Sequence, residues 1–325
     1  MIEIYGTLGP ACADADTLER MFRNGMTGVR LNLSHVTLRQ AETQVEALKT
    51  AAARCGKEPK LLIDMQGPEL RIGALPQPLR LAEGETVRPG TELPLPREVL
   101  DALEPGQELL LDDGKLLLQC ETDGRARVLR GGVLHSRKSV ALPGKSVRLP
   151  ALTESDRENI AAAMDYGVTG VMQPFVRCPA DLRAVRAALD TAGGEKIRLF
   201  AKIESREGLE DLPELLAEAD EIVVARGDLG NAMPLWELPA AQKRIASLCR
   251  AAGKPFMVVT QMLASMERSP VPTRAEVSDI FNAVLDGASS VMVTGETAVG
   301  SYPAETIRYL ANTAREAESY QKPGM

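Results

Sequence analysis

Short apolar runs alternate with amphipathic stretches over most of the chain. Eight of the runs lack regular polar positions, which is typical of strands buried on both faces of a parallel sheet. They cover residues 2–8, 28–33, 60–64, 170–173, 198–202, 221–225, 255–260 and 290–294. Helical periodicity follows each run, at residues 16–24, 38–54, from 153 onward, 180–192, 208–217, 239–252, 274–285 and from 303 onward. Eight strand–helix pairs predict an α/β fold, the (β/α)8 or TIM barrel.

The pattern changes between residues 69 and 150. Short alternating segments at residues 83–86, 108–111, 115–120, 126–129 and 146–149 are separated by turn signals such as Asp123-Gly124 and Pro143-Gly144. Such spacing predicts a small antiparallel β domain, inserted after the third barrel strand. The expected organisation is a first barrel part (residues 1–68), the inserted β domain (69–150) and a second barrel part (151–325).

Composition narrows the class of protein. The chain has 325 residues, a net charge of -7 and a pI near 5.2, so neither nucleic acid nor an anionic membrane is an expected partner. No apolar run reaches membrane-spanning length, and the N-terminus lacks a signal-peptide pattern. Five scattered cysteines without a CxxC motif predict reduced thiols and a cytoplasmic protein. With two histidines, a multi-histidine metal site and a Ser/His/Asp hydrolase are both disfavoured.

The candidate chemistry lies at the ends of the predicted strands. Lys202 and Glu204 follow the fifth strand, and Asp228 follows the sixth. Taken singly, each stretch fits a structural ion pair equally well. The C-terminal strand ends of a barrel share one mouth, however, and other polar residues occupy the same position: Arg30, Asn32, Ser34, Asp64, Thr260, Gln261, Thr294 and Glu296. A lysine beside carboxylates that hold a divalent cation suits phosphoryl transfer or stabilisation of an enolate. No glycine-rich phosphate loop is present.

Segments along nearly the whole chain resemble the pyruvate kinase family. They occur in family order at residues 7–11, 29–35, 67–73, 111–114, 142–144, 149–152, 201–204, 224–230, 260–266, 272–279 and 295–298. The resemblance implies a (β/α)8 barrel with a small β-barrel lid domain inserted after strand three. It also implies transfer of phosphate between phosphoenolpyruvate and ADP, giving pyruvate and ATP through a metal-stabilised enolpyruvate.

The resemblance further implies residue roles. Lys202 is similar to the lysine that stabilises the transferring phosphoryl group and the enolate, and Glu204 and Asp228 resemble the ligands of Mg2+ or Mn2+. The backbone at Ala225, Gly227 and Asp228 resembles the cradle for the substrate carboxylate. Thr260 resembles the threonine beside the substrate methyl carbon, and Thr294 stands at the place of a proton-relay serine.

A monovalent-cation site and a nucleotide site are implied as well. The potassium ligands would be Asn32, Ser34, Asp64 and the carbonyl of Met65. Glu69 accompanies potassium dependence in the family. The groups implied around the nucleotide are Arg30, Asn32, His35, Arg71, Asp113 and Lys138.

Departures from the family pattern keep alternatives open. Val36, Gln40 and Gln66 replace a glycine, an aromatic residue and a lysine near the implied nucleotide and cation sites. Pro174 and Cys178 replace a serine and a lysine. A second hypothesis is therefore a diverged relative with another phosphoryl acceptor, or with lyase or enolate chemistry on a 2-oxo acid. A third, a non-catalytic regulator, is disfavoured by the intact Lys202 and Glu204.

Assembly is also an expectation from the resemblance. The family's C-terminal effector domain would begin near Lys322, so it is expected to be absent. The expected assembly is a homodimer formed through the helix at residues 273–285.

Overall fold

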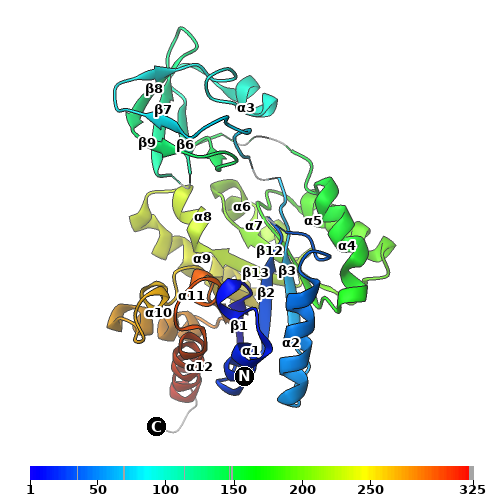
Figure 1. Cartoon of the computed structure of the whole chain (residues 1–325). Coiled ribbons are helices and arrows are strands. Elements are labelled where there is room, and N and C mark those ends of the chain that lie inside the picture. The colour runs from blue at the N-terminus through cyan, green and yellow to red at the C-terminus, as the bar shows by residue number, and fades with distance from the viewer. Residues whose placement is uncertain (35, 69, 113, 146, 148, 322–325) are drawn as a thin grey trace. The chain divides into compact units, whose positions relative to one another are not determined.

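The computed structural model describes residues 1–34, 36–68, 70–112, 114–145, 147 and 149–321. Eight parallel strands close into a barrel in the order β1-β15-β14-β13-β12-β11-β3-β2 (Figure 1), which confirms the predicted (β/α)8 fold. The strands are β1 (Glu3–Thr7), β2 (Gly28–Asn32), β3 (Lys60–Asp64), β11 (Gly170–Gln173), β12 (Arg198–Ile203), β13 (Glu221–Ala225), β14 (Phe256–Val259) and β15 (Ser290–Met292). All eight fall on the predicted apolar runs.

Longer helices follow the strands: α1 (Ala15–Arg23), α2 (Glu42–Arg54), α4 (Glu154–Tyr166), α5 (Pro179–Thr191), α9 (Leu238–Ala251), α10 (Arg274–Leu285) and α12 (Pro303–Tyr320). Short helical turns lie between them: η1 (Pro10–Cys12), α6 (Arg206–Glu210), α7 (Leu212–Leu215), α8 (Arg226–Asn231), η2 (Leu235–Glu237), η3 (Ala264–Glu267) and α11 (Gly295–Ala298). The helix predicted at 208–217 is instead two pieces, α6 and α7, because Pro213 lacks the N–H that a continuous helix needs. The helix predicted from residue 38 begins at Glu42, after a turn.

The barrel interior is filled by a buried cluster that contains Tyr5, Leu62, Met172, Phe200, Val223, Met257 and Met292. Side chains two residues apart on a strand point to the same face of the sheet. Leu62 and Asp64 on β3 therefore point to the same face of the sheet, and so do Phe200 and Lys202 on β12. The apolar interior thus ends in charged groups at the carboxyl ends of these strands.

Residues 68–150, together with Asn231–Pro234, form a second compact unit. It contains a five-stranded antiparallel sheet in the order β10-β6-β7-β8-β5 and a separate pair, β4 with β9. Its elements are β4 (Leu79–Leu81), β5 (Thr86–Val87), α3 (Arg97–Ala102), β6 (Glu108–Leu111), β7 (Leu116–Cys120), β8 (Ala126–Arg130), β9 (Gly132–Leu134) and β10 (Val140–Ala141). The strand predicted at 83–86 is wrong for most of its length, because residues 83–85 form a turn and only Thr86 belongs to a strand, β5. The sequence did not predict β4, α3, β9 or β10. The predicted strand at 146–149 includes two residues outside the described part of the chain.

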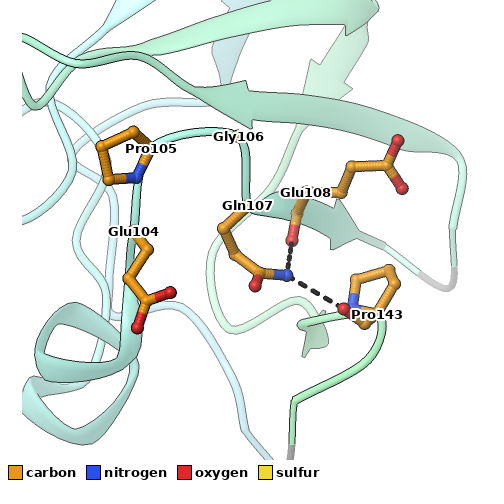
Figure 2. Close-up of a pocket in the computed structure, with 6 residues that line it drawn as sticks. All are labelled: Glu104, Pro105, Gly106, Gln107, Glu108 and Pro143. Carbon is orange, nitrogen blue, oxygen red and sulfur yellow. Dashed lines mark hydrogen bonds between the residues drawn. The ribbon is translucent and has the colours of Figure 1, made fainter.

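This unit has its own core, in which Leu109, Leu111, Leu118 and Val128 are buried. A hollow of about 350 Å3 on the same unit is lined by residues 104–108 and Pro143 (Figure 2). The Gln107 amide closes it by donating to the carbonyls of Glu108 and Pro143, both at 3.0 Å. None of the predicted site residues lines this hollow. Among the described residues, no helix is both long and apolar enough to span a membrane.

Gly170 tests the packing of the barrel interior. A Cβ at this position would lie 2.6 Å from Leu62 Cδ2 and 2.6 Å from Phe200 Cε2. We expect Gly170→Ala to lower the free energy of unfolding by about 1–3 kcal/mol, because the packed core must shift. In the matched variant Gly132→Ala, the new methyl group meets only ordinary contacts, the nearest at 3.6 Å, so its effect should be smaller. Urea unfolding measures both; equal stability of Gly170→Ala and the parent would contradict the expected overpacking.

Candidate active site

Lys202 lies at the centre of a charged cluster at the carboxyl ends of the strands. Its Nζ is 3.2 Å from both carboxylate oxygens of Asp64 and 2.9 Å from Glu204 Oε1. The Asp64 and Glu204 side chains are 3% and 1% exposed, and that of Lys202 is 13% exposed. Residues 138 positions apart in the sequence thus form one ion-paired group, as the strand-end pattern predicted.

Backbone groups fix the orientation of Glu204. Its Oε2 accepts a hydrogen bond from the Phe175 N–H at 2.7 Å, in the loop after β11. Phe175 has a φ of 51°, which is uncommon for a residue other than glycine. Glu204 Oε1 is buried and has no hydrogen bond of normal geometry, although the Lys202 ammonium is near. A buried carboxylate oxygen without a hydrogen bond is costly unless a cation compensates its charge, and here the Lys202 ammonium does so.

The charges change one another's proton affinity. Burial alone would raise the pKa of Asp64, but Lys202 and Arg30 outweigh it and hold that pKa below its usual value. Burial alone would lower the pKa of Lys202, but Asp64 and Glu204 outweigh it and raise it. For Glu204, burial raises the pKa, Lys202 opposes the rise and Asp228 adds to it, so the pKa is about 7.

The residues fit a divalent cation. Glu204 offers Oε1 just beyond β12, and Asp228 adds a second carboxylate in the helical turn α8, directly after the neighbouring strand β13. Mg2+ commonly takes one or two protein carboxylates and completes its shell with water and substrate oxygens. The described part of the chain holds no group of three or more His, Cys, Asp or Glu side chains suited to a metal ion. A metal here would therefore rely on Glu204, Asp228 and non-protein oxygens.

The predicted cation ligands lie at neighbouring strand ends. Asn32 on β2 pairs in register with Asp64 on β3, and Asn32 Oδ1 accepts the Ser34 N–H at 3.2 Å. Met65, 1% exposed, directly follows β3. Amide, hydroxyl, carboxylate and carbonyl oxygens form a donor set that fits a hard monovalent cation. Arg30, predicted on the nucleotide side, donates from Nε to Asp64 Oδ2 at 2.7 Å.

Thr260 is held in a strained turn after β14. Thr260 and Gln261 have φ values of 78° and 54°. The Arg226 guanidinium donates to the Thr260 carbonyl at 2.8 and 3.2 Å and pairs with Asp279 at 2.8 Å. A Cβ on Gly227 would lie 3.1 Å from Thr260 Cγ2, so the backbone after β13 passes close to this threonine.

Thr294 is fixed by a buried carboxylate after β15. Glu296, 1% exposed, accepts the Thr294 N–H at 2.7 Å and the Thr294 hydroxyl at 3.3 Å. Its other oxygen accepts the Leu263 N–H at 3.1 Å, which joins the loops after β14 and β15.

The remaining predicted site residues belong to the second unit or fall outside the described part of the chain. Arg71 and Lys138 belong to the second unit, where Arg71 Nη1 donates to the Arg137 carbonyl at 2.8 Å and Lys138 pairs with Asp112 at 2.9 Å. Their nucleotide role stays a prediction. His35, Glu69 and Asp113 lie outside the described residues. The sequence did not predict the contacts of Phe175 and Arg226. Phe175 contacts Glu204 through its backbone N–H, and Arg226 contacts the Thr260 carbonyl and the Asp279 carboxylate. Only the charge of Arg226 beside Asp228 gave a signal.

A closed barrel with a lysine and carboxylates at the carboxyl ends of its strands defines an enzyme of the (β/α)8 class. Residues 1–307 match the sequence model of the pyruvate kinase barrel domain. The chain therefore belongs to the pyruvate kinase family.

Relatives named pyruvate kinase are similar over nearly the whole chain. The protein of Methylorubrum extorquens is 40% identical, over 97% of this chain and 68% of that protein. That of Corynebacterium efficiens is 39% identical, over 98% and 70%. That of Geobacillus stearothermophilus is 37% identical, over 97% of this chain and 57% of its own length.

The raised pKa of Glu204 predicts a pH-dependent stability in metal-free buffer. The folded protein holds a proton on Glu204 that the unfolded chain releases above its ordinary pKa of 4.5. The stabilising contribution is therefore fully present below pH 4.5 and is lost as the pH rises through 7. The pKa difference, from 4.5 to about 7, corresponds to a loss of roughly 3 kcal/mol in the free energy of unfolding.

Glu204→Gln isolates this contribution, because the amide cannot ionise while other groups titrate as before. Denaturant unfolding with EDTA, from pH 4.5 to 8, should show the parent losing stability relative to the variant as the pH rises. Parallel curves for the two proteins would mean that Glu204 titrates normally.

Proposed function

We propose that the chain transfers a phosphoryl group between phosphoenolpyruvate and ADP, giving pyruvate and ATP. The single observation that carries this proposal is the Lys202 ammonium, held between Asp64 and Glu204 at the barrel mouth. Family membership supports it, because the relatives are named pyruvate kinases. A cytoplasmic location and a homodimer through α10 stay predictions.

The bonds exchanged define what the site must stabilise. The bond between the phosphorus and the enol oxygen breaks, a bond from phosphorus to an ADP β-phosphate oxygen forms, and the enolate takes one proton at its methylene carbon. Negative charge therefore develops on the transferring group and on the enolate oxygen. The Lys202 ammonium stabilises both, because a fixed cation in a water-poor site interacts strongly with developing charge. Mg2+ or Mn2+ on Glu204 and Asp228 would supply a Lewis acid there.

Other residues bind the substrate and move the proton. The backbone at Ala225, Gly227 and Asp228 holds the substrate carboxylate, and the missing side chain of Gly227 leaves that backbone open beside Thr260. Thr260 lies next to the reacting carbon. The Thr294 hydroxyl, hydrogen-bonded to Glu296, belongs to the proton path.

One observation favours a second candidate, an acceptor other than ADP. The Gln40 side chain accepts the Thr37 N–H at 2.8 Å, and the Gln40 N–H is 3.3 Å from Thr37 Oγ1. Gln40 thus folds onto its own loop, and it offers no aromatic face to a nucleobase.

The test is a set of incubations with phosphoenolpyruvate and ADP, GDP, UDP or no acceptor, followed by 31P and 1H NMR. ATP and pyruvate should form together in the ADP sample. Lys202→Met should lower turnover by about 10²–10³-fold, as expected for loss of a group that stabilises an oxyanion. Lys243→Met is the control, because Lys243 is exposed and pairs with Asp286 on the barrel surface. Pyruvate without a nucleoside triphosphate would support the second candidate, and no pyruvate in any sample would overturn the proposal.

Potassium dependence follows from the oxygen ligands at the ends of β2 and β3. We expect turnover in tetramethylammonium buffer at constant ionic strength to rise as potassium replaces tetramethylammonium. Ser34→Ala, which removes one ligand, should raise the potassium concentration for half-maximal rate by about tenfold, a typical cost of losing one interaction with a charged group. If the turnover of the parent protein does not change with the potassium concentration, the monovalent cation has no part in the mechanism.

A further inference from the structure

Asp156 accepts more hydrogen bonds than its place in the helix explains. It lies at the third position of α4, is 0% exposed and forms a capping box with Thr153. Its Oδ2 accepts the Thr153 N–H at 2.9 Å and the Thr153 hydroxyl at 2.8 Å. The bond from the Thr153 N–H, together with the Asp156 N–H that donates to Thr153 Oγ1 at 3.1 Å, completes the capping box at the helix start.

Two further bonds of the carboxylate reach a different segment of the barrel unit. Asp156 Oδ1 accepts the Gln66 N–H at 2.8 Å, and Oδ2 accepts the Gly67 N–H at 3.0 Å. Both amides follow directly after β3 and after Met65, whose carbonyl is a predicted cation ligand. None of these four hydrogen bonds of Asp156 reaches a side chain of the predicted cation ligands.

The bond to Gln66 sets the direction of the Met65 carbonyl. The Gln66 N–H and the Met65 C=O belong to one planar trans peptide group, in which they point in opposite directions. Fixing the N–H therefore fixes the carbonyl. A carboxylate at the N–H end also polarises the peptide, which makes the carbonyl oxygen a better ligand for a cation.

The flanking groups limit the remaining freedom of this peptide. The Met65 N–H donates to the Met172 carbonyl at 3.1 Å, so the preceding peptide is also fixed. Gly67 has a φ of 60°, and a side chain there would collide with the Pro174 ring. The carbonyl of Met65 is thus held from both sides.

We propose that Asp156 is a positioning residue for the monovalent-cation site, acting through the Met65–Gln66 peptide. The proposal rests on the proposed potassium site and adds a buried carboxylate that orients one of its ligands without touching the ion. The competing explanation is that Asp156 only caps α4.

The chain offers matched controls for the capping explanation. Thr273 and Glu276 form a second capping box on α10, and Glu276 also accepts bonds from another loop, through the Ser265 N–H and hydroxyl at 2.7 and 2.6 Å. Thr153→Ala weakens the cap of α4 but leaves the Asp156 carboxylate beside Gln66 and Gly67. Asp156→Glu keeps a carboxylate that can cap α4, because glutamate is the usual residue at this position of a capping box. The longer side chain moves the carboxylate away from the Gln66 N–H.

The experiment compares Asp156→Asn, Asp156→Glu, Thr153→Ala and Glu276→Gln in the full chain. Three quantities are measured. The first is the rate of amide hydrogen exchange at residues 66 and 67. The second is the potassium concentration that gives half of the rise in melting temperature when potassium replaces tetramethylammonium, and the third is the potassium concentration for half-maximal turnover. We expect both Asp156 variants to speed exchange and to raise both potassium constants by about tenfold, as for loss of a hydrogen bond to a charged group. Turnover at saturating potassium should change far less.

The controls should lower the melting temperature while leaving both potassium constants close to those of the parent. If Asp156→Asn does not fold, Asp156→Glu carries the test, because its cap is retained. Unchanged exchange, or unchanged potassium constants in a parent that responds to potassium, would overturn the positioning role alone. A parent protein without any potassium response, thermal or kinetic, would overturn the cation site and the positioning role together.

Discussion

The Lys202 ammonium is the interaction on which the barrel mouth depends. Two buried carboxylates, Asp64 and Glu204, lie beside it, and without a cation between them they would repel each other at close range. Removing one partner of a buried ion pair leaves an uncompensated charge, which costs more than the pair contributes. The same ammonium thus balances the two carboxylates at the strand ends and is available for catalysis.

Buried carboxylates that accept backbone N–H groups hold the surrounding loops. Glu204 fixes Phe175, Asp156 fixes Gln66 and Gly67, and Glu296 joins Leu263 to Thr294. Each bond ties a loop after one strand to a neighbouring element. The bond from the Phe175 N–H to Glu204 stabilises the positive φ of Phe175, and the Arg226 guanidinium plays the corresponding part at the Thr260 carbonyl.

The opposite end of the barrel shows what a purely structural charged cluster looks like. Glu221, at the start of β13, is 1% exposed, and its oxygens accept bonds from Ser289, Ser290 and Arg198. Every oxygen of this carboxylate has a partner. Glu204 differs because its buried Oε1 has the Lys202 ammonium beside it, at 2.9 Å, and no further hydrogen bond. The proposed metal site uses this oxygen.

The sequence by itself determined the barrel, because eight buried strands need eight uninterrupted apolar runs and period-two alternation places Asp64 and Lys202 inside. It also predicted which charged residues follow the strand ends, because lysine and carboxylates are unusual after buried apolar runs. Only the tertiary structure revealed the backbone contacts of Phe175, Arg226 and Asp156. Their contacts involve backbone N–H and C=O groups, which every residue has, so no side-chain pattern encodes the pairing. Pro213 divides the 208–217 helix, and a turn at Gly84, with a φ of 85°, separates β4 from β5.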